Sequence, residues 1–221
     1  MALCDNWSVR LAGIVAAGLV LVGMAGCGRL AITPVAKAVA APTLDPKSVS
    51  LSAQDLPDRL APCPESGRID RYLQHLQIEG SPSYELTAGQ WAALKRGGAT
   101  GAWVQSYAHS ADDCVARLGE RKGPSAISFA IRFKDEPAAT AGFAGGFLGL
   151  RPEAGMLIPG LARGDETQLT PTAWSYDQTD RLPGLFVAYW ANRQFDLFLL
   201  TERVAPDAAR RAASGMNGRV H

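Results

Sequence analysis

The chain has 221 residues, of which 47% are hydrophobic and 19% charged, and its formal net charge is +1. This composition is that of a folded protein with one domain plus extensions. Without an excess of basic charge there is no electrostatic basis for binding nucleic acid or an anionic membrane surface, so we expect no nucleic-acid partner.

An uninterrupted apolar run lies near the N-terminus. Residues 11–25 read LAGIVAAGLVLVGMA, without a charged side chain. A helix that spans a bilayer needs about 20 apolar residues, so this run is too short for a span and has the length of a signal-peptide core. Arg10 and the free amino group supply the positive charge expected before that core, which Asp5 partly offsets.

The stretch Met24-Ala25-Gly26-Cys27 resembles the lipobox of bacterial lipoproteins, although Met24 stands where leucine is usual. The resemblance implies that residues 1–26 are a signal peptide and that Cys27 receives a diacylglycerol thioether and becomes the mature N-terminus. Two or three acyl chains then anchor the protein stably in membrane lipid. We therefore expect a lipid-anchored protein of the cell membrane or outer membrane, with its folded part outside the cytoplasm. The alternatives are an ordinary secretory signal and a short uncleaved anchor.

Residues 27–50 form a segment rich in alanine, valine and proline. It contains three prolines and no apolar periodicity. This pattern is typical of an extended, flexible tether. The remaining residues, 51–221, are then expected to form a single globular α+β domain.

The cysteine count points to one disulfide. Signal-peptide cleavage removes Cys4 and lipidation occupies Cys27, which leaves Cys63 and Cys114. In an exported domain an even pair of this kind is expected to be oxidised to a disulfide. The alternatives are a metal-binding pair or free buried thiols, but no CxxC or Cys/His cluster indicates a metal site. We expect no metal and no cofactor.

The apolar spacing of the globular part predicts alternating helices and strands. Helices are expected over residues 68–78, 87–96, 112–119, 135–150 and 207–213. Strands are expected over residues 100–110, 126–133, 167–176, 185–190 and 195–202. This order indicates an α+β fold with a mainly antiparallel sheet of about four to five strands packed by helices.

The last two strands are expected to form a hairpin around Asn192-Arg193. Their two faces are both largely apolar, which predicts a central place in the sheet with the helix over residues 137–150 covering one side. Asp196 is the one charged residue of the second strand, and its face is therefore expected to be the wetter one.

The second half of the domain resembles small exported lipoprotein domains of the sensor or PsbP-like type. The resemblance rests on a strand, a strand that leads into an alanine-rich helix, the stretch IPGLARGDET and the paired strands at the end. It contains no sharp motif, and no site residue is carried over from it.

No catalytic motif stands out in the chain. The sequence lacks GxSxG, HExxH and a GxxxxGK[ST] loop. His109 lies close in sequence to Asp112, Asp113 and two serines, Ser106 and Ser110, a grouping that is more typical of a solvated loop than of a catalytic set. The glycines of GFAGGFLG, residues 142–149, are interpreted as close packing of a helix on the sheet.

Aromatic residues on the predicted strands are candidates for ligand binding. If exposed together, they would suit stacking on a glycan or contact with a protein of the envelope; the alternative is ordinary core packing. The candidates are Trp103, Tyr107, Trp174, Tyr176 and Trp190.

Three functions are consistent with these patterns. The first is a membrane-anchored exported lipoprotein with a non-enzymatic domain that binds a ligand or partner. The second is a small lipid-anchored hydrolase that uses His109. The third is an assembly accessory without a small ligand. A cleft that converges on His109 would favour the enzyme, and exposed contiguous aromatics would favour binding.

Overall fold

The computed structural model describes residues 44–57, 60–117, 119–152, 155–156, 158–178 and 184–221. The predicted signal peptide, Cys27 and most of the tether lie outside these ranges. In the described part of the chain no helix combines the length and apolar character needed to cross a membrane. The elements in chain order are α1 (Pro46–Val49), η1 (Ala53–Asp55), β1 (Ala61–Pro62), β2 (Gly67–Arg68), α2 (Ile69–Ile78), α3 (Tyr84–Arg96), β3 (Ala99–Ala108), α4 (Ala111–Val115), β4 (Ser125–Phe133), α5 (Glu136–Ala144), β5 (Leu161–Arg163), η2 (Gly164–Thr167), β6 (Ala173–Asp177), β7 (Phe186–Asn192), β8 (Phe195–Glu202) and α6 (Pro206–Gly218).

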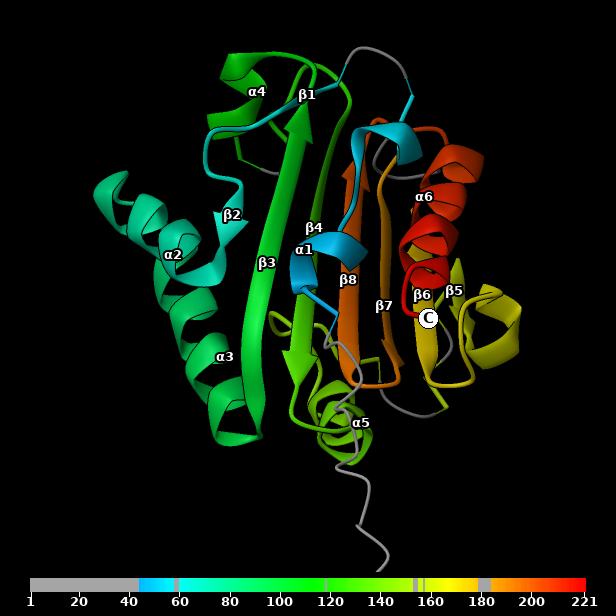
Figure 1. Ribbon diagram of the computed structural model, residues 1–221. Helices are drawn as coiled ribbons and strands as arrows, with labels where there is room; N and C mark the ends of the chain where they lie inside the picture. Colours follow the sequence, from blue (N-terminus) through cyan, green and yellow to red (C-terminus); the bar gives the residue numbers. More distant parts are fainter. Residues whose placement is uncertain (1–43, 58–59, 118, 153–154, 157, 179–183) are drawn as a thin grey trace, which may run out of the picture. The chain divides into compact units, whose positions relative to one another are not determined.

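The described strands form one antiparallel sheet of eight strands, in the order β1-β3-β4-β8-β7-β6-β5, with β2 also paired to β3 (Figure 1). The expected α+β class and antiparallel sheet are confirmed, but the expected number of four to five strands is wrong. The missed strands are β1 and β2, of two residues each, and β5, of three residues. Such segments are too short to show the alternation that marks a strand in a sequence.

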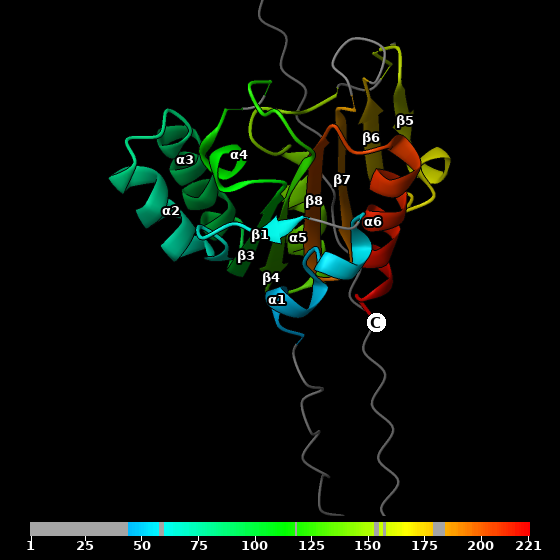
Figure 2. The same ribbon diagram turned by 90° about the horizontal axis from the view of Figure 1, so that it is seen from above.

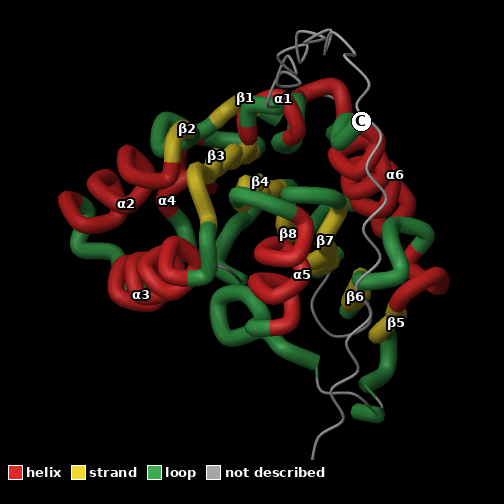
Figure 3. The backbone as a smooth tube through the Cα atoms, turned by 60° about the horizontal axis from the view of Figure 1, so that its bottom comes forward, coloured by secondary structure: helices red, strands yellow, loops and turns green. Residues whose placement is uncertain are grey.

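The β7–β8 hairpin lies in the middle of the sheet, as its two apolar faces predict. Asn192 pairs with Phe195, so Arg193 and Gln194 form the two-residue turn. On one face, Trp190, Leu197 and the neighbouring alternate residues pack against α1 and α6. On the other face, Tyr189 and Phe198 pack with side chains of α2, α3 and α5. The domain therefore has two cores, one on each side of a shared sheet (Figures 2 and 3).

Helix α5 is shorter than its pattern predicts. Asp135 caps its first turn by accepting a hydrogen bond from the Ala138 N–H at 2.9 Å. The expected end at Leu150 is wrong, because the helix stops at Gly145 and the next residue, Gly146, has φ +79°. A left-handed φ is the usual way for a helix to end, and glycine adopts it without strain.

The predicted close packing of the glycine-rich segment is confirmed at Gly142. A Cβ added there would lie 2.5 Å from the Phe133 ring and 2.7 Å from Asp196 Oδ2. Only glycine lets α5 approach the sheet this closely. The helix consequently closes off the part of the core that contains Asp196.

The prediction that Asp196 lies on the wetter face is wrong. Asp196 has no exposed surface. The Tyr189 hydroxyl donates a hydrogen bond to its Oδ2 at 3.0 Å. Burial raises the pKa of Asp196 to about 8, and the hydrogen bond from Tyr189 offsets this only in part. The sequence alone could not show that a tyrosine from the neighbouring strand supplies the donor.

Folded structure begins before residue 51, the expected start of the domain. Asp45 caps α1, and Val49 is completely buried in the core that α6 covers. Downstream, Arg219 makes a bidentate contact with Asp55, at 3.0 and 2.8 Å, and ties the first residues of the domain to its last helix. Burial acts to raise the pKa of Asp55, but hydrogen bonds from Arg219 and Ser52 outweigh it and leave that pKa lowered.

Candidate functional site

The five aromatic candidates do not come together in one place. Tyr107 and Trp190 are buried in the core that faces α6, and Trp174 is buried in the opposite core, where Tyr176 packs at its edge. Trp103 is half-buried. Its indole N–H donates to Gln105 at 3.2 Å, and the Lys47 ammonium lies 5.2 Å from the ring centroid. The five aromatic residues are therefore distributed over both faces of the sheet. The sequence could group them only by residue type.

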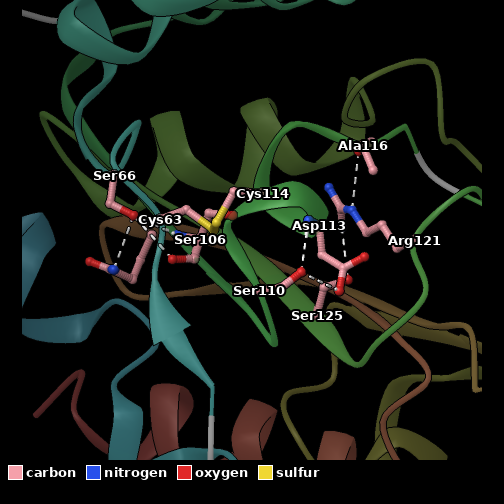
Figure 4. The surroundings of a disulfide bond; sticks show 10 residues. Cys63, Ser66, Ser106, Ser110, Asp113, Cys114, Ala116, Arg121 and Ser125 are labelled. Atoms are coloured by element: carbon pink, nitrogen blue, oxygen red, sulfur yellow. Dashed lines mark hydrogen bonds between the residues drawn. A yellow bond between two sulfur atoms is a disulfide. The ribbon is translucent and has the colours of Figure 1, made fainter.

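The residues around His109 serve the local fold. The Asp113 carboxylate accepts hydrogen bonds from the Lys122 N–H at 2.7 Å and the Gly123 N–H at 3.1 Å. It also accepts one from the Ser110 hydroxyl at 3.0 Å (Figure 4). The hydrogen bond from Lys122 is the main reason why the pKa of Asp113 is lowered. Among the described residues, His109 has no hydrogen bond to this carboxylate, and its side chain is exposed. Asp113 therefore shapes the loop that follows α4.

A cleft of about 600 Å³ lies beside the disulfide. Its walls come from α2, from α4 and the loop that follows it, and from the ends of β3, β4 and β8. We call it the Glu65 cleft. The polar and charged side chains that line it are Glu65, Tyr72, His75, Glu79, Ser81, Ser83, Ser106, Arg117 and Arg121. A volume of this order suits a small-molecule ligand.

Two largely buried side chains of this cleft have polar groups without a protein partner. Glu65 is only 7% exposed and Tyr72 only 8%. Within the described ranges, neither the Glu65 carboxylate nor the Tyr72 hydroxyl makes a hydrogen bond or ion pair. Neither group is closed off from solvent, because both line the cleft. Their hydrogen-bond partners are therefore water or a ligand in the cleft.

Charges of opposite sign act on the Tyr72 hydroxyl. Burial and, to a smaller extent, the Glu65 charge raise the pKa of Tyr72 to about 12, against the lowering effect of the Arg121 charge. Both charges therefore lie near this hydroxyl. Arg121 makes no ion pair with Glu65 within 4.0 Å; its guanidinium donates to the Ala116 carbonyl at 3.3 Å and to the Ser125 hydroxyl at 2.9 Å.

The Cys63–Cys114 disulfide is present, as the cysteine count predicts (Figure 4). Its Cα atoms are 5.7 Å apart, and it joins the segment between β1 and β2 to α4. Glu65 follows Cys63 by two residues, and Cys114 itself lines the cleft. The bond thus holds together two walls of the Glu65 cleft.

One group of three potential metal ligands occurs among the described residues. It comprises Cys63, Glu65 and Cys114, whose ligand atoms all lie within 4.8 Å of one another. Both sulfur atoms are bonded to each other in the disulfide, and thiolate is the form that binds metal. In the oxidised protein the group therefore offers one carboxylate, which is not a metal site by itself.

The comparisons with known proteins give no relative: no family model, curated protein sequence or solved structure matches this chain. The site must therefore be interpreted from its own chemistry.

Proposed function

We propose that the protein is an exported, membrane-anchored binding protein whose domain takes a small polar ligand in the Glu65 cleft without transforming it. The observation that carries the proposal is a pair of largely buried side chains, Glu65 and Tyr72, whose polar groups face the cleft and have no partner among the described residues. Buried polar groups in folded proteins are almost always hydrogen-bonded. The polar groups of Glu65 and Tyr72 open only onto a cleft and have no protein partner, which supports a site that is completed by its ligand.

The hydrolase alternative has less support. Nucleophilic catalysis needs a base within hydrogen-bond reach of the nucleophile and a third group that orients the base. His109 is exposed, and the neighbouring Asp113 carboxylate already accepts hydrogen bonds from the backbone N–H groups of Lys122 and Gly123. In the Glu65 cleft, His75 has no side-chain hydrogen bond to Ser83, Ser106 or any other described residue.

A panel of small polar compounds tests the binding role. Amino acids, polyamines, sugars and carboxylic acids at millimolar concentration are added to the full-length protein, and thermal unfolding is recorded. We expect at least one class to raise the Tm of the wild type but not that of Glu65→Gln. Glu136→Gln, which changes an exposed residue in the first turn of α5, is the matched control and should respond like the wild type. Absence of any shift, or equal shifts in Glu65→Gln, would contradict the proposal.

The anchor is proposed from the lipobox resemblance. Acylation of Cys27 would hold the domain near a membrane surface through the tether, with the Glu65 cleft in the extracytoplasmic space. Mass spectrometry of the mature N-terminus should find an acylated cysteine, and Cys27→Ala should release the protein from membranes or block its processing. An unmodified start at another residue, or a retained Met1, would contradict this part of the proposal.

A further inference from the structure

Resting on the proposed binding role of the Glu65 cleft, we infer the class of its ligand: a small zwitterion with a cationic amine at one end, an anionic group at the other and a short apolar spacer between them. The cleft carries charge of both signs, and its acid Glu65 makes no ion pair with the arginines Arg117 and Arg121 that line the same cleft.

The amine end follows from the Glu65 carboxylate. An ionised carboxylate only accepts hydrogen bonds, so its partner must be a donor. A cationic donor suits it best, because a charge removed from water is stable only when an opposite charge compensates it. The Tyr72 hydroxyl lies near this carboxylate and can accept a second hydrogen bond from the same ammonium group.

The anionic end follows from two arginines that line the same cleft. Arg121 and Arg117 both line the cleft, and neither makes an ion pair with a carboxylate among the described residues. Arg121 is fixed by hydrogen bonds to Ala116 and Ser125, so its position is set before a ligand arrives. A guanidinium held in this way is suited to a carboxylate or phosphate.

The spacer follows from the apolar part of the walls. Leu76 of α2, Ile127 of β4 and Leu200 of β8 line the same cleft as Glu65 and the two arginines. A few methylene groups would cover part of this apolar surface, and their burial favours binding. Because Glu65 makes no ion pair with either arginine within 4.0 Å, a ligand that contacts both charges needs its amine and its anion joined by a short chain.

A matched six-carbon series tests this inference. The four probes are 6-aminohexanoate, hexylamine, hexanoate and hexanamide, titrated into the full-length protein by isothermal calorimetry. We expect 6-aminohexanoate to bind at least about tenfold more tightly than either singly charged probe, because a hydrogen bond to a charged group contributes about 1.5–3 kcal/mol. Equal affinities across the series would overturn the inference.

Charge-removing variants assign each end. Glu65→Gln should weaken 6-aminohexanoate and hexylamine by about tenfold and leave hexanoate unchanged, and Arg117→Gln should do the reverse. Tyr72→Phe removes only the hydroxyl and should weaken only the amine-bearing probes. Arg211→Gln, an exposed arginine of α6, is the control and should bind every probe like the wild type.

Two further outcomes separate this inference from the proposed function. If a neutral or singly charged compound binds tightly in a Glu65-dependent manner, the cleft is a binding site and the zwitterion class is wrong. If no compound binds in a Glu65-dependent manner, both fail. Glycerophosphoethanolamine is added as a second zwitterion, because its phosphate distinguishes a source in lipid headgroups from the amino-acid source that 6-aminohexanoate represents.

Discussion

Two acid–tyrosine combinations lie on the side of the sheet that α2, α3 and α5 cover, and their carboxylates are enclosed differently. Asp196 and Tyr189 lie beneath α5 and bond to each other at 3.0 Å. Glu65 and Tyr72 lie beside a cleft and are bonded to no described residue. The rings of the two tyrosines are linked through Phe129 and Phe147, at centroid distances of 5.7, 5.0 and 5.6 Å.

The Asp196 carboxylate is sealed from solvent and its Oδ1 has no partner, whereas the Glu65 carboxylate opens onto a cleft. At Asp196, the close approach of Gly142 excludes solvent, and the raised pKa, about 8, keeps the acid neutral at neutral pH. At Glu65, the disulfide joins the segment between β1 and β2 to α4, and the cleft beside this bond stays open. Proteins keep incompletely satisfied groups of this kind where function requires them. We call Asp196 and Tyr189 the sealed pair, and Glu65 and Tyr72 the open pair. Variants of the sealed pair, of the helix packed over it and of the disulfide beside the open pair test this difference.

The largest effect is expected from Leu197→Asp. Leu197 is completely buried on the face opposite Asp196, in the core that α6 covers. A carboxylate there has no tyrosine to pair with, so we expect a loss of about 4 kcal/mol or more in the free energy of unfolding, or no folding at all. Asp196→Ala should cost about 1–3 kcal/mol, the effect of leaving the Tyr189 hydroxyl unpaired. Equal, small shifts in urea melts of the two variants would contradict the hairpin's place in the core.

Loss of the disulfide should rank second. Its two cysteines are 51 residues apart in the sequence. In the chain-entropy model a closed loop of this length contributes about 4 kcal/mol, and measured values are often lower. We expect Cys63→Ala/Cys114→Ala to lower the Tm and to weaken binding in the Glu65 cleft, whereas the hydrogen exchange of β7 and β8 should stay slow. Recovery of both residues as free thiols from exported wild-type protein would show that the bond does not form.

The sealed pair should make stability depend on pH. The folded protein keeps a proton on Asp196 up to about pH 8, whereas the unfolded chain releases it near pH 3.8. The free energy of unfolding should therefore fall as the pH rises between these two values, by up to about 1.4 kcal/mol per unit from this group. Asp196→Asn should remove that slope and be the more stable protein at pH 8.5. Asp207→Asn, at an exposed site, should retain the slope; parallel curves for wild type and Asp196→Asn would disprove the burial effect.

Two glycine variants give the smallest effects, of opposite sign. Gly142→Ala places a methyl group against Phe133 and Asp196 and should destabilise by about 1–3 kcal/mol through overpacking. Gly89→Ala lies in the exposed middle of α3 with open space around its Cβ, and should stabilise by about 0.5–1 kcal/mol. Thermal melts of both variants measure the difference. A neutral Gly142→Ala would mean that α5 does not seal the pair.

The sequence predicts the fold further than it predicts the site. The two apolar runs around Asn192-Arg193 identify the central hairpin, because continuous hydrophobicity marks a strand buried on both faces. The sequence does not predict β1, β2 or β5, because these short strands form only by pairing with longer neighbouring strands. Asp196 is misjudged because its donor comes from the adjacent strand and its cover from a glycine of α5.

The sequence does not identify Glu65 as a site residue, because its surroundings also form only in the folded chain. It lies in the irregular stretch CPESG, where a single acidic residue is typical of a solvated loop. The one feature of the sequence that could have pointed to Glu65 is its position two residues after Cys63, which is predicted to form the disulfide. Burial and the Tyr72 neighbour become visible only when the disulfide draws the segment against α4.

Amide chemical-shift mapping by NMR tests the central claim most directly. The ¹⁵N-labelled full-length protein is titrated with 6-aminohexanoate. If the Glu65 cleft binds the probe, the amide chemical shifts should change mainly in residues 63–66, 72–83 and 114–121. The amides of the 186–198 hairpin around Asp196 should stay unchanged. Shifts centred on the hairpin, or no shifts around Glu65 at saturating probe, would contradict it.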